Sequence, residues 1–393
     1  MKPISSLLIC FLSLNCFAQE NTSQHSFPGI NNWEESIAKA KRENKTIMVD
    51  LSTEWCTWCK VMDKKIFTDP EVLSLMQPKL NSYILDAEKD SIGQLLKLKY
   101  GIASYPSFLF FTPQGEYLET WAGSMPKEYW VQYIKDSIDN EPIKRPGIPT
   151  ALSFQWPDFV QNEIKANFKK SAPSDSVLTN YFLHCNYKDF IDFNVCRFYP
   201  KNIPDSLLEV MMKDKDWLNQ NYGADIVNDL LSTSINWKAY DQIQSRNWSK
   251  AWFYMNQYDA NFPQNDWELF NVKLFYFEAK NEVDSLIKLG LENPSFVYDH
   301  TASEIIEFIC ENGKTKEQFK QAEMWNKAEL EKSVVYKFAK YQAQICFKLS
   351  DIVEAKKWAK IALEKAKNEG VQLNKDDELI RILASKKEGI SEG

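Results

Sequence analysis

The chain has 393 residues, and at about 150 residues per domain this length predicts two or three domains. Hydrophobic residues make up 44% and charged residues 26%, which is typical of a globular protein that buries a sizeable core. The net charge of −7 argues against nucleic acid or an anionic membrane surface as the main partner. The sequence holds only three His, so a His-rich zinc site is excluded too.

The N-terminus has the pattern of a secretory signal peptide. Lys2 precedes an apolar stretch from Ile4 to Leu14, and small residues at Cys16 and Ala18 suit cleavage after Ala18. We therefore predict that residues 1–18 are a signal peptide and that the mature chain is periplasmic or secreted. A buried N-terminal helix and a lipid anchor at Cys16 are the alternatives. No later segment has about 18 uninterrupted apolar residues, so we expect no membrane span.

Residues 27–140 alternate between helical and strand periods, which predicts a small α/β domain. The expected elements are, in order, a helix at Trp33–Asn44, a strand at Thr46–Leu51, a helix at Cys56–Phe67, a helix from Asp69 and Pro70, a strand at Tyr83–Leu85, a helix at Ile92–Tyr100, a strand at Ser107–Phe111, a strand at Tyr117–Trp121 and a helix at Lys127–Ile138.

A proline-rich segment follows this domain. Residues 141–157 hold four prolines, and because proline fixes φ and interrupts helices we predict a semi-rigid linker there. Residues 158–393 have helical periodicity almost throughout, so the fold class is an α/β domain followed by an all-α domain.

The all-α part contains an internal repeat. Residues 322–332 and 355–365 are identical at six of eleven positions, at an offset of 33 residues. This period, with small residues at close-packing positions, resembles the tetratricopeptide helix-turn-helix repeat and predicts a helical solenoid that is clearest at 300–370. The alternative is a chance likeness between two amphipathic helices. A solenoid of this kind suits the binding of a partner protein or peptide.

Two cysteines carry the clearest chemical signal. Cys56 and Cys59 follow a predicted strand and open a helix, where the helix dipole and free N–H groups stabilise a thiolate. We predict that an exposed Cys56 is the nucleophile and that Cys59 attacks the resulting mixed disulfide. No second Cys-x-x-Cys or nearby His supplies further zinc ligands, so we expect no metal. The only expected redox group is the Cys56–Cys59 disulfide itself, without a cofactor.

Two further residues support this site. Asp50 precedes Cys56 by six residues at the end of a strand, where a buried carboxylate acts as proton acceptor for the second thiol; a solvent-facing Asp is the alternative. Pro106 stands after Tyr105 at the entrance of a strand and is a candidate for a cis peptide bond, with a trans turn as the alternative.

These residues together resemble the thioredoxin superfamily. The likeness extends over about residues 30–140 and rests on Asp50, on Trp55 with Cys56 and Cys59, and on Pro106. It is closest to the C-terminal domain of the thiol:disulfide interchange reductases and to related exported thioredoxin-like proteins. The resemblance implies that Cys56 attacks, that Cys59 resolves, that Asp50 is the buried acid, and that a cis Pro106 lies beside the dithiol.

The same resemblance implies how substrate is bound. The backbone beside Pro106 would pair with an extended substrate peptide. We add Trp55, Trp58 and Tyr105 as candidate substrate-binding residues, and for Trp58 packing on the fold is the alternative. The dipeptide between the cysteines is Thr57-Trp58 instead of the Gly-Pro of general thioredoxins, so the direction of electron flow cannot be carried over.

Four cysteines remain outside the site and the signal. Cys185 and Cys196 are eleven residues apart and form either a structural disulfide or two buried free thiols. Cys310 and Cys346 fall on helix faces that we expect to be buried, where a disulfide is less expected.

These observations favour an exported thiol–disulfide oxidoreductase that reduces or isomerises protein disulfides. Its partners would be protein or peptide thiols and disulfides, with an upstream electron donor if it acts as a reductase. Two alternatives place the function in the helical domain. One is a non-catalytic binding or assembly protein, and the other is a redox sensor whose disulfide state alters the helices.

Overall fold

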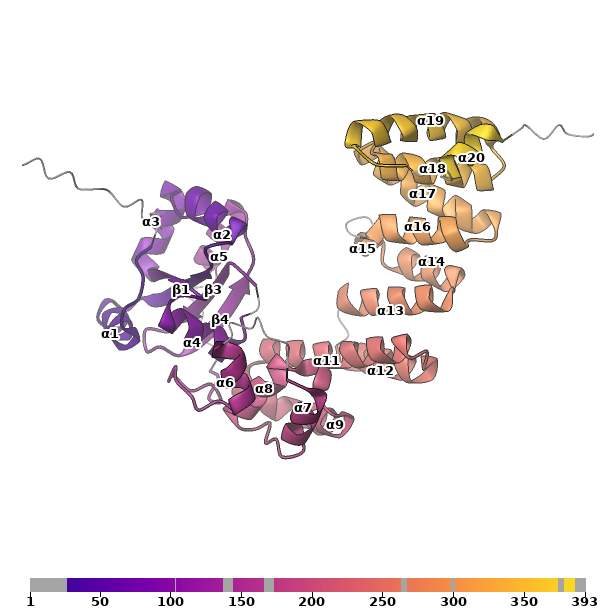
Figure 1. Cartoon of the computed structure of the whole chain (residues 1–393). Coiled ribbons are helices and arrows are strands. Elements are labelled where there is room, and N and C mark those ends of the chain that lie inside the picture. Colours follow the sequence, from indigo (N-terminus) through magenta and orange to yellow (C-terminus); the bar gives the residue numbers. More distant parts are fainter. Residues whose placement is uncertain are drawn as a thin grey trace, which may run out of the picture. The chain divides into compact units, whose positions relative to one another are not determined.

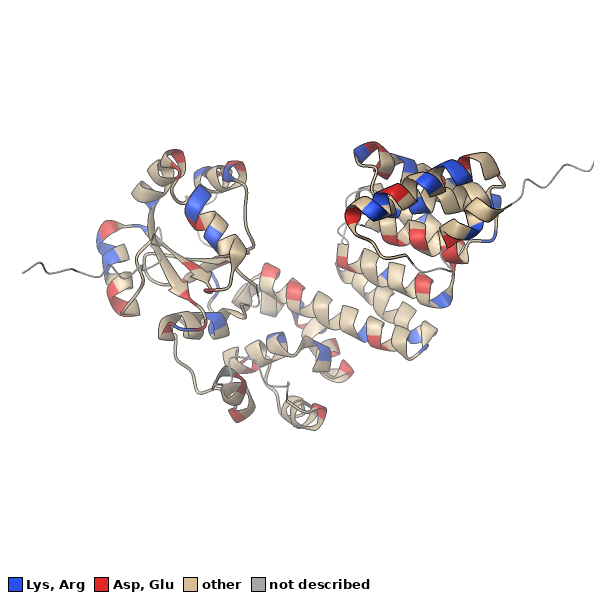
Figure 2. Cartoon of the chain, turned by 45° about the horizontal axis from the view of Figure 1, so that its top comes forward, with Lys and Arg blue, Asp and Glu red and all other residues tan. Residues whose placement is uncertain are grey.

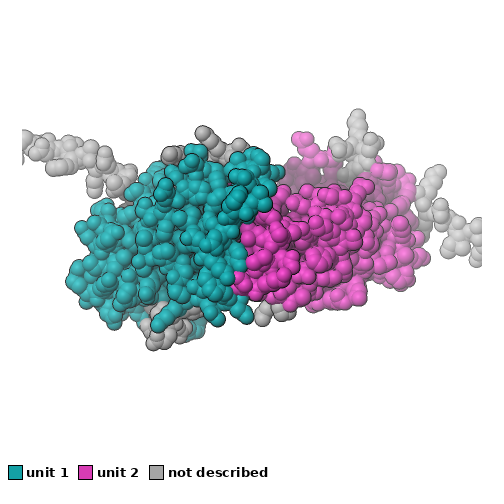
Figure 3. All heavy atoms as spheres, turned by 90° about the horizontal axis from the view of Figure 1, so that it is seen from below, with its two compact units in different colours: residues 1–198, 216–224 teal, residues 199–215, 225–393 magenta. Residues whose placement is uncertain are grey.

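The computed structural model describes residues 27–102, 104–136, 144–165, 173–262, 267–297, 301–373 and 378–385. The predicted signal peptide, with its alternative lipid anchor at Cys16, lies outside these residues. The chain divides into two compact units (Figure 3), one of residues 1–198 and 216–224, the other of residues 199–215 and 225–393. The predicted fold class, an α/β domain followed by a mostly helical region, is confirmed.

The α/β domain in the first unit is built on a four-stranded sheet (Figure 1). Its elements are α1 (Trp33–Glu43), β1 (Thr46–Ser52), α2 (Thr57–Val61), a π-helical turn η1 (Met62–Ile66), α3 (Pro70–Lys79), β2 (Leu80–Asp86), α4 (Ser91–Tyr100), β3 (Ser107–Phe111), β4 (Tyr117–Ala122) and α5 (Lys127–Asp136). The strand order is β2-β1-β3-β4. β1 runs parallel to β2, and β3 is antiparallel to both of its neighbours.

Helices cover both faces of this sheet because β3 is apolar on both sides. Phe108 and Phe110 point to one face, where they pack with Trp130 of α5 and with apolar residues of η1 and α3. Phe111 points to the other face and contacts Trp33 of α1 and Tyr100 of α4 at 5.0 and 5.6 Å between ring centroids. β3 is therefore a central, fully buried strand of this domain.

Local caps fix where these helices begin and end. Asp69 accepts hydrogen bonds from the backbone N–H groups of Glu71 and Val72, and Pro70 occupies the first turn of α3. Gly101 ends α4 in the left-handed conformation, at φ 65°.

The first unit also contains helices that follow the proline-rich segment, namely α6 (Asp158–Lys165), α7 (Asp175–Phe182), α8 (Phe190–Phe198) and α10 (Lys215–Tyr222). Two cations join them and the segment to α4. The guanidinium of Arg197 donates to the carbonyl of Tyr100 at 2.9 Å. The buried ammonium of Lys99 donates to the carbonyl of Pro149, and its burial lowers its pKa to about 7.

The second unit consists of helices. They are η2 (Pro200–Asn202), α9 (Asp205–Lys213), α11 (Ala224–Gln244), α12 (Trp248–Asn261), α13 (Trp267–Lys280), α14 (Val283–Glu292), α15 (Pro294–Phe296), α16 (Ala302–Asn312), α17 (Lys316–Lys332), α18 (Tyr336–Lys348), α19 (Ile352–Glu369) and α20 (Glu378–Ala384). From α12 to α14 and again from α16 to α20, successive helices pack against one another, as Figure 1 shows for α16 to α20.

Small residues bring the last helices close together. Ala355, Ala359 and Ala362 of α19 are fully buried against Ala339 and Ala343 of α18. Charged residues of both signs recur along these helices (Figure 2), and some form ion pairs, such as Lys357 with Glu354. The described residues contain no helix that is long and apolar enough to cross a membrane.

Candidate functional site

The dithiol lies at the start of α2, directly after strand β1. Cys56 and Cys59 are joined in a disulfide. Cys56 is the N-cap of α2, and its Sγ accepts a hydrogen bond from the backbone N–H of Cys59 at 3.0 Å. A sulfur in this position faces the positive end of the helix dipole, so the local backbone favours negative charge on Cys56 once the disulfide is opened.

The prediction that Cys56 is exposed is wrong for the oxidised chain, where 4% of Cys56 and 3% of Cys59 is accessible. The reason is local. The bond to Cys59 and the hydrogen bond from its backbone N–H draw the Cys56 sulfur onto the helix end. The neighbouring aromatic side chains are open instead, because Trp55 and Trp58 are 64% and 62% exposed.

Asp50 is fully buried in the middle of the sheet. It lies in β1, in register with Ile84 of β2 and Phe108 of β3. Within the described part of the chain neither carboxyl oxygen has a hydrogen-bond partner. Burial raises the pKa of Asp50 well above its usual value, and the carboxylate of Asp63 raises it further. The alternative of a solvent-facing Asp is therefore wrong, because Asp50 is fully buried.

Asp63 is a site residue that the sequence analysis missed. It lies on the π-helical turn that continues α2, four residues after Cys59. Its carboxylate acts on buried Asp50, and because the helix changes to a π-helical turn here, regular helical spacing does not reveal this.

The loop before β3 brings a second group of predicted residues to the dithiol. The peptide bond between Tyr105 and Pro106 is cis, as the resemblance implied. The rings of Tyr105 and Trp55 meet edge to face at 5.8 Å between centroids. Trp55 also donates from its indole N–H to the carboxylate of Glu88 at 3.3 Å. Trp55 therefore joins the cysteine turn, the loop after β2 and the loop before β3.

Charged side chains surround this aromatic contact, and the sequence analysis did not identify them. The ammonium of Lys97 lies over the Tyr105 ring at 5.7 Å from its centroid. Burial, with the carboxylates of Glu88 and Asp86, raises the pKa of Tyr105 to about 12. Glu54, two residues before Cys56, forms an ion pair with Lys89. These groups converge only through long-range folding, so their sequence positions carry no signal.

Trp58 stands apart from this aromatic group. Its high exposure contradicts the alternative that it packs on the fold. The indole between the two cysteines thus leaves a hydrophobic face open to solvent.

Among the described residues the other four cysteines, Cys185, Cys196, Cys310 and Cys346, are free thiols. The sulfurs of Cys185 and Cys196 are 3.8 Å apart, close but not bonded. Cys310 is buried, and burial raises the pKa of its thiol to about 12. Among the described residues no group of three or more His, Cys, Asp or Glu side chains is arranged to hold a metal ion.

Comparison with known proteins identifies the α/β region. Residues 33–138 match the family model of the thioredoxin-like domain. The match agrees with the sheet, the disulfide and the cis peptide bond described above, so this part of the chain is a thioredoxin-like domain.

Curated relatives resemble the same region. The chain is 35% identical over 97 residues to the thiol:disulfide interchange protein DsbD of Photorhabdus laumondii, which covers 24% of this chain and 17% of the relative. It is 36% identical over 103 residues to the DsbD of Colwellia psychrerythraea, which covers 25% of this chain and 17% of the relative. The chain thus spans about a sixth of the length of these relatives.

Among solved structures, the chain is similar to a thioredoxin from Thermus thermophilus, at 22% identity and a TM-score of 0.25, over 28% of this chain and 82% of that one. Another is the DsbH oxidoreductase, at 18% identity and a TM-score of 0.26, over 32% of this chain and 94% of that one.

Proposed function

We propose that the protein is an exported thiol–disulfide oxidoreductase that reduces or isomerises disulfides of other proteins, with its helical region binding a partner. The observation that carries this proposal is the Cys56–Cys59 disulfide at the N-terminus of α2, where the Cys56 sulfur accepts the backbone N–H of Cys59. The relatives named above are thiol:disulfide interchange proteins, and we extend that activity to this chain.

The proposed reaction begins with the reduced dithiol. The Cys56 thiolate attacks a substrate disulfide, so a mixed disulfide forms and one substrate thiolate leaves. Asp50 takes the proton of Cys59, directly or through water, and the Cys59 sulfur then attacks the sulfur of Cys56. This step closes the Cys56–Cys59 disulfide and releases the second substrate thiol. Two electrons pass to the substrate, and an upstream dithiol donor must return them; no cofactor takes part.

Substrate contact is proposed for Trp55, Trp58, Tyr105 and Pro106. Trp58 offers its open indole, and Trp55 and Tyr105 form a joined aromatic surface beside the cysteines. The backbone at Pro106 would pair with the extended substrate segment, although the Pro106 carbonyl already accepts from the N–H of Gly123 at 2.8 Å. Pairing would therefore use the backbone on the Tyr105 side.

Trapping in the native cell envelope tests the activity. In Cys59→Ala the second thiol is missing, so Cys56 should remain joined to its substrates as mixed disulfides that vanish on reduction. Cys56→Ala is the matched control and should give no adducts. A folded, exported Cys59→Ala protein without Cys56-dependent adducts would refute the enzyme and favour the non-catalytic binding protein.

Export is tested separately by mass spectrometry of the mature protein. A chain that begins at Gln19 supports cleavage after Ala18, and a lipid-modified Cys16 identifies the lipoprotein alternative. An unprocessed N-terminus on Met1 would contradict the proposed periplasmic or secreted location.

A further inference from the structure

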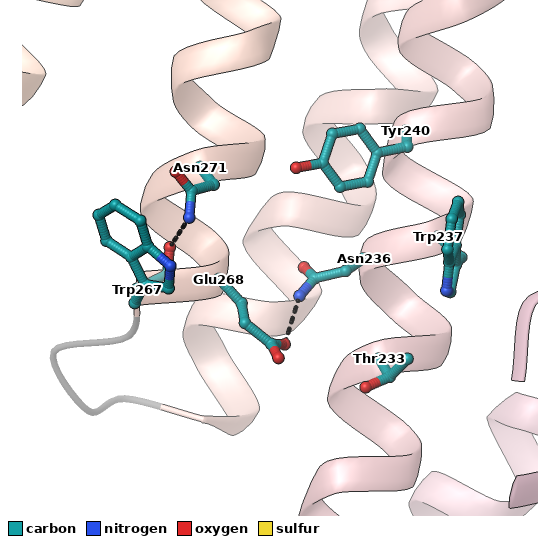
Figure 4. Close-up of a pocket in the computed structure, with 7 residues that line it drawn as sticks. All are labelled: Thr233, Asn236, Trp237, Tyr240, Trp267, Glu268 and Asn271. Carbon is teal, nitrogen blue, oxygen red and sulfur yellow. Dashed lines mark hydrogen bonds between the residues drawn. The ribbon is translucent and has the colours of Figure 1, made fainter. Parts of the chain in front are cut away.

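A cavity of about 320 Å³ lies between α11 and α13 in the helical unit. Figure 4 shows Asn236 and Tyr240 of α11 facing Glu268 of α13 across this space, with the Asn271 amide donating to the carbonyl of Trp267 at 2.9 Å. The volume is at the lower end of the range of ligand pockets, so it suits a single side chain better than a large ligand.

Aromatic rings with open surface form part of the cavity wall. Trp237 is 43% exposed and Trp267 is 36% exposed, and the Tyr240 ring lies between the two helices. Exposed indoles at a cavity mouth are unfavourable in water and favourable against a ligand. The Trp237 ring already accepts one cation within the chain, because the ammonium of Lys201 lies 5.3 Å from its centroid.

A carboxylate faces the middle of the cavity. Glu268 accepts a hydrogen bond from the side-chain amide of Asn236 at 3.0 Å, which fixes its position. Burial raises the pKa of Tyr240, and the carboxylates of Glu268 and of Glu304 on α16 raise it further. Glu268 is exposed, and a carboxylate beside aromatic rings is complementary to a cation.

We propose that this cavity binds an arginine or lysine side chain of a partner polypeptide, with Glu268 as the counter-ion and Trp237 and Tyr240 as cation-binding rings. The inference deepens the partner-binding part of the proposed function and does not depend on the dithiol chemistry. Asn271 lies at the side of the same cavity, where an amide can bond to the backbone of the bound segment.

The test measures peptide binding to the full-length protein by fluorescence anisotropy at physiological ionic strength, which screens non-specific attraction. The probe is a fluorescein-labelled oligo-arginine peptide. Its neutral control is oligo-citrulline of equal length, which keeps the shape and removes the charge. We expect oligo-citrulline to bind at least about tenfold more weakly.

Variants locate the binding. Glu268→Gln should weaken oligo-arginine binding about tenfold, and Trp237→Leu should weaken it about fivefold. Glu317→Gln, which removes one exposed carboxylate from α17, is the matched charge control and should bind within about twofold of the natural chain. If circular dichroism shows that Glu268→Gln does not fold, the proposal is judged by whether Trp237→Leu weakens oligo-arginine binding.

Equal affinity for both peptides would overturn the proposal, as would equal affinity of the Glu268→Gln and Glu317→Gln variants. The dithiol is assayed in parallel by reduction of insulin disulfides. If the peptide does not bind but insulin disulfides are reduced, only the proposed cavity function is refuted. If insulin is not reduced but the peptide binds as expected, only the proposed oxidoreductase activity is refuted.

Discussion

The backbone N–H of Cys59 points at the sulfur of Cys56, with 3.0 Å between the two atoms. The hydrogen bond depends on the backbone and on the N-cap position of Cys56, so it survives replacement of the Cys59 side chain. This hydrogen bond explains how a single turn of helix favours a thiolate at Cys56 while Cys59 stays protonated.

The reactivity of the reduced chain follows from this contact. In Cys59→Ala we expect Cys56 to react with iodoacetamide at neutral pH at least about tenfold faster than the buried thiol of Cys310, whose pKa burial raises to about 12. Peptide mass spectrometry after timed quenching measures both rates in the same sample. Equal rates would show that the helix end does not activate Cys56.

Asp50 has opposite effects on stability and on catalysis. Its pKa is higher in the folded chain than in the unfolded chain, so the unfolding free energy falls as pH rises from the ordinary carboxyl range toward the raised value. Asp50→Asn keeps the shape without the charge. We expect it to unfold at higher urea concentration than the natural chain at neutral pH, and at the same concentration below about pH 3, where the carboxyl is protonated in both states.

The same variant should lower disulfide exchange by about tenfold or more, because Cys59 loses its proton acceptor. The control is Glu116→Gln, at an exposed turn, which should change neither property. Urea titrations at several pH values and an insulin reduction assay measure the two effects. A variant that is less stable at neutral pH, or fully active, would show that Asp50 does not have the proposed role.

Local sequence signals were sufficient to predict most elements of the thioredoxin-like domain. Asp69 and Pro70 marked the start of α3, Gly101 marked the end of α4, and the apolar run at 107–111 marked the central strand. Each of these features is determined within a few residues, so no tertiary contact is needed to find it.

Features that depend on distant residues were not predicted. The π-helical turn at Met62–Ile66 interrupts a helix whose periodicity looks regular, and it places Asp63 in electrostatic reach of Asp50. Arg145, in the proline-rich segment, donates to the carbonyl of Tyr222, which lies 77 residues further along the chain. None of these contacts has a signature in local composition.

The alanines of α19 make a prediction about the helical region. Ala359 is fully buried where α18 and α19 pack closely, and the neighbouring Lys360 is exposed. Ala359→Leu forces extra methyl groups into this contact and should lower the unfolding free energy by about 1–3 kcal/mol. Lys360→Leu adds a leucine without overpacking and should change it by less than about 0.5 kcal/mol. Chemical denaturation followed at the helical circular dichroism band compares them, and equal effects would contradict close packing at Ala359.

The last prediction concerns Cys185 and Cys196, whose sulfurs are 3.8 Å apart. Cys185 is half-buried and Cys196 is fully buried, and the neighbouring Cys185 together with burial raises the pKa of the Cys196 thiol. Oxidised glutathione should therefore react first at Cys185. The Cys196 sulfur then displaces glutathione, so the two thiols become one disulfide and two molecules of reduced glutathione are released.

A disulfide between Cys185 and Cys196 closes a short loop and should raise the unfolding free energy by about 2–3 kcal/mol. Variants that lack either cysteine should show no such increase. Thiol titration of the denatured protein measures the reaction directly. Treatment should remove two of the four free thiols of the described chain and leave those of Cys310 and Cys346. Cys196→Ala is the control, because its Cys185 would stop at the glutathione adduct, a mass increase that reduction reverses. Four titratable thiols after prolonged treatment would mean that the backbone around α7 and α8 holds the sulfurs apart.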